Sequence, residues 1–287
     1  MSARTTPHPS EQTRAWRELA RQPDAAIDVA LGASLIAADF VSGFDPADLA
    51  HEFDALAAPL VERGLGSMSL EAQVAELSQH LFGTLGFRGN TADYYDPNNS
   101  LLPRVVHSRQ GIPLTLALVF VEIATRAGVS AHGVTFPGHF LVRVDKGVED
   151  FPSPIFVDAF AGGRTLEDED LDHLLRRALG PTAIRLPEHT KKANPRATLV
   201  RLLTNLKSAY LGRGEVARAE LALHRVIDLV PHSVLALRER ALLSKKLGAH
   251  YSAAGDLARV LEMDPLAHDA EDLKREIETL TAGRTLN

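Results

Sequence analysis

The chain has 287 residues, a formal net charge of −6 and a pI near 6.1, values that disfavour a nucleic-acid or anionic-membrane partner. It contains no cysteine, which excludes disulfides, thiolate metal sites and thiol catalysis. No apolar run reaches the roughly 18 residues of a membrane-spanning helix, and the N-terminal stretch lacks the apolar core of a secretory signal. We therefore expect a cytoplasmic protein that does not associate with membranes.

The first third of the chain is predicted to be helical. Residues 1–10 are polar and contain prolines, which predicts a disordered tail. Between residues 11 and 81, apolar side chains recur at helical spacing. Asp45 followed by Pro46 is typical of a helix start, and Ser69 is predicted to begin the next helix.

The composition changes at residue 87. Residues 87–113 are rich in glycine, asparagine, aspartate and proline, which predicts a long loop or a set of turns. Loops of this length are more often functional than decorative. The helix that begins near Pro113 is apolar on almost every face, so we expect it to lie buried at the centre of its domain, with Gly128 as its C-cap.

Strands are predicted after this helix. In residues 139–145 apolar and polar side chains alternate, as in a half-buried strand. Residues 146–154 are then expected to form a hairpin connection, and residues 155–160 the next strand. Another helix is expected from about Leu166 to Leu179. Antiparallel strands packed on a central helix indicate an α+β fold.

The C-terminal part is predicted to be all-α and contains an internal repeat. Pro231 and Pro265 are 34 residues apart (265 − 231), and Ala219 and Ala253 keep the same offset. A 34-residue period with small residues at fixed positions resembles the tetratricopeptide repeat, although Lys207 stands where a small residue is usual. Two repeats are fewer than the roughly three that bury a continuous core. We therefore expect them to dock on the N-terminal domain or on a partner chain.

Three residues are placed by these elements as in a papain-type nucleophilic site. Such a site needs a nucleophile at a helix N-terminus, a histidine base and a carboxylate or amide that orients the histidine. Thr115 lies in the first turn of the central helix, His139 opens a strand, and Asp158 ends a neighbouring strand. The topology is compatible with a triad of these side chains. A lone histidine on a strand is more often structural, so both interpretations stay open.

Several segments resemble the Sir-B-type transglutaminase-like family. They are, in order, GFRGNTADYYDPNNS, SRQGIPLTLALVFVEIATRAG, GVTFPGHFLVRV and FVDAFAGG, and the resemblance covers about residues 25–180. It implies a transglutaminase-like, papain-like core in which a central helix packs on an antiparallel sheet. The C-terminal repeats also occur in that family. Active members carry Cys, His and Asp, and the resemblance places Thr115, His139 and Asp158 at those positions.

Threonine in place of cysteine changes the chemistry of the site. A thiol has a pKa near ~8.5, whereas a hydroxyl is far less acidic and would need His139 to remove its proton during attack. The transglutaminase reaction itself is therefore disfavoured. One hypothesis is a non-catalytic protein that binds a protein or peptide in the cleft, on the repeats, or both. The alternative is a Thr-dependent hydrolase of peptide or amide bonds. A third interpretation is a purely structural fold with a filled cleft.

Further candidate binding residues are Tyr94, Tyr95, Asn98, Asn99 and Arg109 near the cleft, and Arg201, Arg238 and Lys245 on the repeats. The two asparagine amides suit a peptide backbone, although turn formation explains them equally well. The basic residues of the repeats are expected to share a concave face and attract an acidic segment. No metal-ligand spacing and no nucleotide-binding motif is present, so no cofactor is expected.

The predicted organisation has four parts. They are a disordered tail over residues 1–10, a transglutaminase-like domain over 11–185, a linker over 186–196 and tetratricopeptide-like helical repeats over 197–287. The expected partner is a protein or peptide. The sequence does not indicate the oligomeric state.

Overall fold

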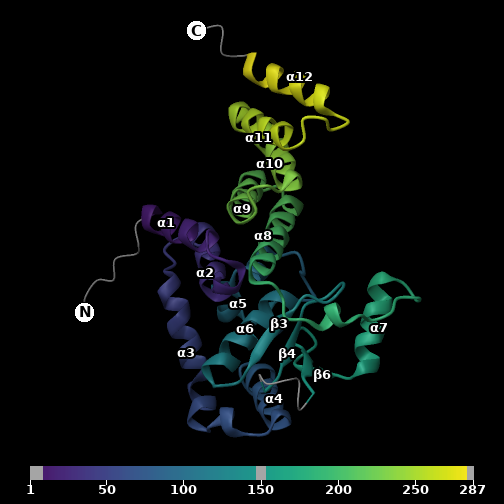
Figure 1. Cartoon of the computed structure of the whole chain (residues 1–287). Helices are drawn as coiled ribbons and strands as arrows, with labels where there is room; N and C mark the ends of the chain where they lie inside the picture. The colour runs from purple at the N-terminus through teal and green to yellow at the C-terminus, as the bar shows by residue number, and fades with distance from the viewer. Residues whose placement is uncertain (1–8, 147–152, 283–287) are drawn as a thin grey trace, which may run out of the picture. The chain divides into compact units, whose positions relative to one another are not determined.

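The computed structural model describes residues 9–146 and 153–282. The chain divides into two compact units, Met1–Leu202 and Leu203–Asn287 (Figure 1). The boundary falls inside the long helix α8 (Pro195–Gly212), just after the linker expected at residues 186–196. Most of the disordered tail expected at residues 1–10 lies outside the described residues, and the first helix begins at Pro9.

Helices make up most of the first unit. Its helices before α8 are α1 (Pro9–Ala20), α2 (Val29–Phe40), α3 (Pro46–Glu62), α4 (Leu70–Ser78), α5 (Leu102–Ser108), α6 (Pro113–Arg126) and α7 (Asp168–Leu179). The predicted helix starts are confirmed, because the Asp45 carboxylate accepts the N–H of Ala47 at 2.9 Å and the Ser69 hydroxyl accepts the N–H of Ala72 at 3.2 Å. A π-helical segment, η3 (Gln79–Thr84), extends α4.

A four-stranded antiparallel sheet forms the second layer of this unit. Its strands are β3 (Ala131–Val134), β4 (Leu141–Val144), β5 (Ile155–Asp158) and β6 (Arg164–Leu166), and they follow one another in chain order. On β4, Val142 lies opposite Gly133 of β3 and Val157 of β5. A separate parallel pair joins β1 (Arg88–Gly89) to β2 (Gln110–Gly111). The hairpin connection expected between β4 and β5 falls mainly on residues 147–152, outside the described residues.

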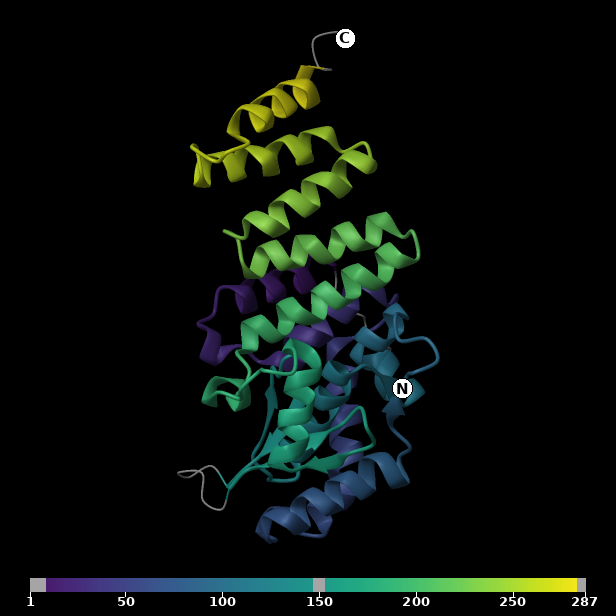
Figure 2. The ribbon, with the colours of Figure 1, turned by 90° about the vertical axis from the view of Figure 1, so that its right-hand side faces the viewer.

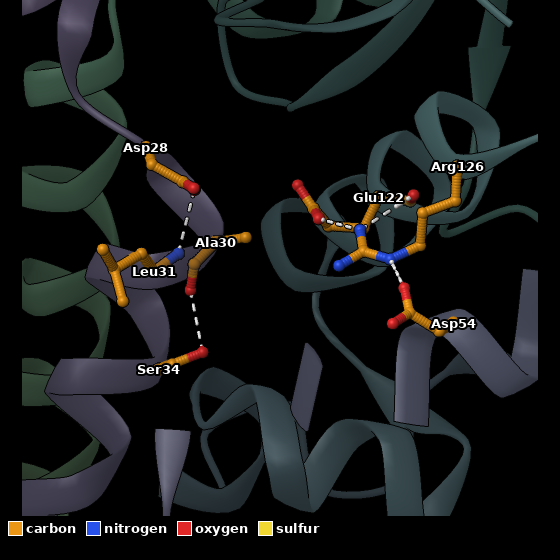
Figure 3. A network of polar contacts seen from close by, with 7 residues as sticks. All are labelled: Asp28, Ala30, Leu31, Ser34, Asp54, Glu122 and Arg126. Atoms are coloured by element: carbon orange, nitrogen blue, oxygen red, sulfur yellow. Dashed lines mark hydrogen bonds and ion pairs between the residues drawn. The ribbon is translucent and has the colours of Figure 1, made fainter. Parts of the chain in front are cut away.

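The predicted burial of the central helix is confirmed. α6 packs between α3 on one side and strands β3 and β4 on the other (Figure 1). At its C-terminal end, Arg126 donates from Nε to the Asp54 carboxylate on α3 at 2.8 Å and also pairs with Glu122 (Figure 3). Near this network Asp28 caps α2 by accepting the N–H of Leu31 at 3.0 Å. Packing against α3 and the sheet, together with these polar contacts at its C-terminal end, therefore holds α6 in place.

Strand β4 is more buried than its sequence predicts. Both Leu141 and Val142 are fully buried, although only one face of the strand was expected to be covered. Successive side chains point to opposite faces of a sheet. One face of β4 packs on α6, and on the other Leu141 joins a cluster that includes Leu171 and Leu175 of α7. The sheet therefore lies between two helices.

Two segments differ from the sequence-based expectation. Residues 87–113 are not wholly loop, because α5 and a 3-10 turn, η4 (Pro97–Ser100), lie within them. Val105 and Val106 of α5 are buried, and this burial stabilises a helix too short to persist alone. The helix expected from Leu166 begins only at Asp168, since Leu166 ends strand β6.

The second unit continues from α8 as successive helices. They are α9 (Val216–Leu229), α10 (Val234–Lys246), α11 (His250–Met263) and α12 (Ala270–Thr281). Figure 2 shows α9 to α12 as a stack. Ala219, Ala241 and Ala253 are almost completely buried, as expected where two helices of one repeat approach closely. Lys207 fits at its unusual place because its ammonium reaches the carboxylate of Glu239 at 2.7 Å.

Candidate functional site

His139 and Asp158 meet at one end of the sheet. His139 follows a tight turn in which Gly138 has φ of 70°, a conformation that favours glycine, and strand β4 begins two residues later. Asp158 is the last residue of β5. Because β4 and β5 are antiparallel neighbours, the start of one lies beside the end of the other. The His139 Nε2 atom lies 2.8 Å from Asp158 Oδ2.

The Asp158 carboxyl is held in its charged form. Burial alone would raise its pKa, but the hydrogen bond and charge of His139 and the N–H groups of Ala161 and Phe160 outweigh burial and lower the pKa. Both N–H groups donate to Oδ1 at 3.0 Å. A charged Asp158 requires the hydrogen on Nε2 of His139, which leaves Nδ1 as the remaining ring nitrogen. Within the described part of the chain, no hydrogen bond reaches Nδ1.

The structure does not bring Thr115 to this pair. Its side chain is completely buried. Its hydroxyl donates to the carbonyl oxygen of Asn99 at 2.7 Å and accepts the N–H of Ile112 at 3.1 Å. A hydroxyl has one proton, so the Thr115 proton is already engaged away from His139. Thr115 fastens the start of α6 to the preceding loop.

A pocket of about 460 Å³ opens beside His139 and Asp158. Its lining consists of Tyr94, Pro113, Pro137, Gly138, His139, Asp158, Phe160, Leu174, Arg177 and Ala178. Among the described residues, Pro113 is the one from α6 that lines it, at the first turn of the helix. Proline carries no nucleophilic side-chain atom. The place from which a helix N-terminus would present a nucleophile to the histidine is therefore occupied by proline.

Sequence reasoning missed Pro113 as a pocket residue, and it missed the α7 wall of the pocket. Pro113 was recognised only as the start of a helix. Leu174, Arg177 and Ala178 carried no local signal, because their approach to His139 depends on how α7 covers the sheet. The turn before His139 approaches α7 closely at Gly138, since a Cβ atom on Gly138 would come within 2.9 Å of Ala178 Cβ.

Of the loop residues proposed to bind a ligand, Tyr94 lines the pocket, whereas the two asparagines hold the loop in its conformation. Tyr94 lines the pocket, and its ring meets Tyr95 and Phe160 edge-on at centroid distances of 5.3 and 5.9 Å. Asn99 is buried and holds this loop, because its amide donates to the carbonyl of Tyr94 at 3.1 Å. The Asn98 amide bonds the Asp96 carboxylate at 3.0 Å within the turn. The two asparagine side chains therefore shape the loop.

Arg109 ends a helix, and its side chain packs on an aromatic ring of the same domain. It ends α5 with φ of 59°, the left-handed conformation that non-glycine residues rarely adopt. Its guanidinium lies 4.7 Å from the centroid of the Phe87 ring. Burial lowers the pKa of Arg109, and its Nη1 atom is buried without a hydrogen-bond partner among the described residues.

The three basic residues proposed for the repeats are engaged within the protein. Arg201 belongs to the first unit, with its guanidinium 5.4 Å from the Phe140 ring centroid, and burial lowers its pKa. In the second unit, Arg238 forms two hydrogen bonds with Asp269 at 2.6 and 3.0 Å. Lys245 pairs with Glu276. These ion pairs join α10 to α12 and to the residue just before it, and they neutralise charges that were expected to attract an acidic segment.

Comparison with known families agrees with this fold. A family model of the transglutaminase-like superfamily matches residues 47–204, more than half of the chain. The chain belongs to this superfamily. Residues 206–278 of the same chain match a tetratricopeptide-repeat family. A transglutaminase-like domain followed by helical repeats is thus confirmed, and the narrower Sir-B-type resemblance stays a prediction.

The chain is also similar to individual proteins, two of them over most of their length. The UPF0162 protein of Xylella fastidiosa is 36% identical over 278 residues, which cover 94% of this chain and 95% of the relative. The UPF0162 protein of Pseudomonas aeruginosa is 34% identical over 246 residues, covering 85% and 86%. A shorter similarity of 34% identity over 113 residues joins 38% of this chain to 18% of F-box only protein 21 of Homo sapiens.

Across residues 9–146 and 153–282, no group of three or more histidine, cysteine, aspartate or glutamate side chains has a metal-binding arrangement. Over the same ranges, no helix combines the length and apolarity that crossing a bilayer demands.

We expect Thr115→Val to destabilise the transglutaminase-like domain by about 1–3 kcal/mol, because the buried carbonyl of Asn99 and N–H of Ile112 would each lose a partner. Valine keeps the branched shape, so packing changes little. Thr125→Val, at an exposed position of the same helix, is the matched control and should change stability by less than about 0.5 kcal/mol. Urea denaturation measures both. Equal stabilities of the two variants would contradict a structural role for the Thr115 hydroxyl.

Proposed function

We propose that this chain is a non-catalytic member of the transglutaminase-like superfamily. In this proposal it binds a peptide or protein in the pocket beside His139 and Asp158, on its repeats, or both. The observation that carries the proposal is Pro113, which lines the pocket at the N-terminus of α6 and offers no nucleophile. The histidine and carboxylate of a nucleophilic site are retained without the atom that they would activate.

The repeats support a protein or peptide partner. Tetratricopeptide repeats generally mediate protein interactions, and residues 206–278 match that family. On α10, Leu235 is 70% exposed and Leu242 is 50% exposed. These two leucines are seven residues apart, which places them two turns apart on one face of the helix. Their apolar surface is available for contact with a partner.

The alternative function is a hydrolase of peptide or amide bonds with Thr115 as nucleophile. The observation that favours it is the His139–Asp158 pair, whose geometry suits a general base. It requires the Thr115 hydroxyl to leave the Asn99 carbonyl and reach His139, although both hydrogen-bonding partners of that hydroxyl are buried with it. Turnover that disappears in Thr115→Ala would support this function.

Two assays on the full chain test the proposal. In the first, a fluorescent primary amine and glutamine-containing peptides are supplied, and we expect neither amine incorporation nor amide hydrolysis above the blank. In the second, a photo-crosslinking phenylalanine replaces Tyr95, which is 70% exposed next to the pocket residue Tyr94. Its crosslinks should disappear when Ala178→Trp fills the pocket and should persist with Arg176→Trp on the same helix.

Either assay can contradict the proposal. Turnover by the wild-type chain that is lost in His139→Ala would show that the site is catalytic. Crosslinks that are unaffected by Ala178→Trp would remove the pocket from the binding function and leave the repeats as the remaining surface.

A further inference from the structure

The pocket beside His139 is lined by a cationic side chain, Arg177, that no ion pair among the described residues engages. Three of its lining side chains are ionisable acids or bases other than tyrosine, namely His139, Asp158 and Arg177. The Asp158 carboxylate accepts hydrogen bonds from His139 Nε2 and from two main-chain N–H groups. The carboxylate is therefore satisfied within the protein and contributes little attraction for a cationic ligand.

Arg177 differs from the arginines around it. Arg176 pairs with Asp172 at 3.8 Å, and Arg185 pairs with Asp172 at 2.9 Å and with Asp168 at 2.7 Å. Arg177 lines the pocket, and across the described parts of the chain no ion pair or hydrogen bond engages its guanidinium. A guanidinium presents a planar set of N–H donors that matches a carboxylate in two-point geometry.

The other walls are compatible with an apolar group attached to an anion. Tyr94 and Phe160 meet edge-on at 5.9 Å, and Pro137 and Leu174 extend the apolar lining. Pro113 places the first turn of α6 at the pocket, and the positive end of a helix dipole favours negative charge. The volume of about 460 Å³ is within the range of small-ligand sites.

We propose that this pocket binds a carboxylate carried on an apolar stem, with Arg177 as the residue that selects the negative charge. The carboxylate belongs to a peptide, either at its C-terminus or on a glutamate side chain. The inference rests on the proposed function, in which the pocket binds peptides without turning them over. It adds the chemistry of the group that enters the pocket.

Four small probes separate charge from shape. N-acetyl-leucine and N-acetyl-leucinamide differ only in the C-terminal charge. N-acetyl-glutamate α-amide and N-acetyl-glutamine α-amide differ only in the side-chain charge. Each is titrated into the full chain while the imidazole NMR signal of His139, assigned with His139→Gln, reports binding. We expect at least one acid to bind about tenfold more tightly than its amide, as a charged hydrogen-bonded pair gives.

Arg177→Gln should remove this preference for acids, whereas Arg176→Gln should keep it, because Arg176 lies outside the pocket lining. Preference for N-acetyl-leucine would identify a peptide C-terminus as the source, and preference for the glutamate probe would identify a side chain. Equal binding of acids and amides, a preference that survives Arg177→Gln, or no response of the His139 signal would overturn the inference. Release of ammonia from either amide probe would instead contradict the non-catalytic function.

Discussion

Replacing Pro113 by cysteine is expected to create a reactive thiol with a pKa about 1–3 units below the ordinary value of ~8.5. Pro113 lines the pocket with His139 and stands at the N-terminus of α6. A thiolate there would be stabilised by the imidazole and by the helix dipole. The chain contains no other cysteine, so the introduced thiol is observed alone. The pH dependence of iodoacetamide alkylation, followed by mass spectrometry, gives the pKa of this thiol.

Thr115→Cys is the matched control, only two positions away on the same helix. Its thiol would be buried where the threonine hydroxyl now bonds Asn99, and we expect it to react slowly at every pH at which the fold persists. In a Pro113→Cys, His139→Gln double variant, the thiol pKa should rise toward its ordinary value. A more reactive thiol at Thr115 than at Pro113 would show that Thr115, and not Pro113, faces the histidine.

The largest expected loss of stability in the second unit follows Arg240→Met. Arg240 forms two hydrogen bonds with Asp256 at 2.8 and 2.6 Å, joining α10 to α11. Only 12% of the Arg240 side chain and 3% of the Asp256 side chain are exposed. Removing the guanidinium leaves a buried carboxylate without its partner, which costs about 3–5 kcal/mol. Thermal unfolding followed by circular dichroism measures the loss.

The pair itself is expected to contribute far less than that loss. Replacing both residues, with Arg240→Met and Asp256→Leu, should recover most of the stability, because no unpaired charge remains. Lys274→Met, which breaks an exposed pair with Glu271, is the surface control and should cost less than about 0.5 kcal/mol. If Arg240→Met were as mild as Lys274→Met, the Arg240–Asp256 pair would not stabilise the repeats.

Much of the fold could be predicted from local patterns. The caps at Asp45 and Ser69 and the burial of α6 are encoded within a few residues of each feature. The repeat could be recognised because both of its copies are present in the sequence and can be compared residue by residue. Helix α5 was not predictable, since no side chain caps its N-terminus and its stability comes from the burial of Val105 and Val106.

The candidate site was predictable only in part. The meeting of His139 and Asp158 follows from antiparallel neighbours, whose start and end share one edge of the sheet. The identity of the α6 residue that faces them does not follow. Pro113 and Thr115 are two residues apart, so they differ by about 200° around the helix. A helix that is apolar on nearly every face gives no indication of which side meets the sheet.

The partners of Arg238 and Lys245 were hidden for a similar reason. Their carboxylates, Asp269 and Glu276, lie 31 residues further along the chain on the approach to α12 and within it. From the sequence alone, a basic residue on an exposed face of α10 looks available to bind a ligand. Only the packing of α12 shows that its charge is already paired. The tertiary structure therefore decides the role of these charges.

Proline at position 113 also has a consequence for the main chain. The nucleophile of an acyl-transfer enzyme often contributes its own backbone N–H to the oxyanion hole, where it stabilises the tetrahedral intermediate. Pro113 has no N–H, so the first residue of α6 offers neither that donor nor a nucleophilic side-chain atom. Under the proposed non-catalytic function, we expect a peptide aldehyde, which becomes tetrahedral only when a nucleophile adds to it, to bind no more tightly than the corresponding peptide amide.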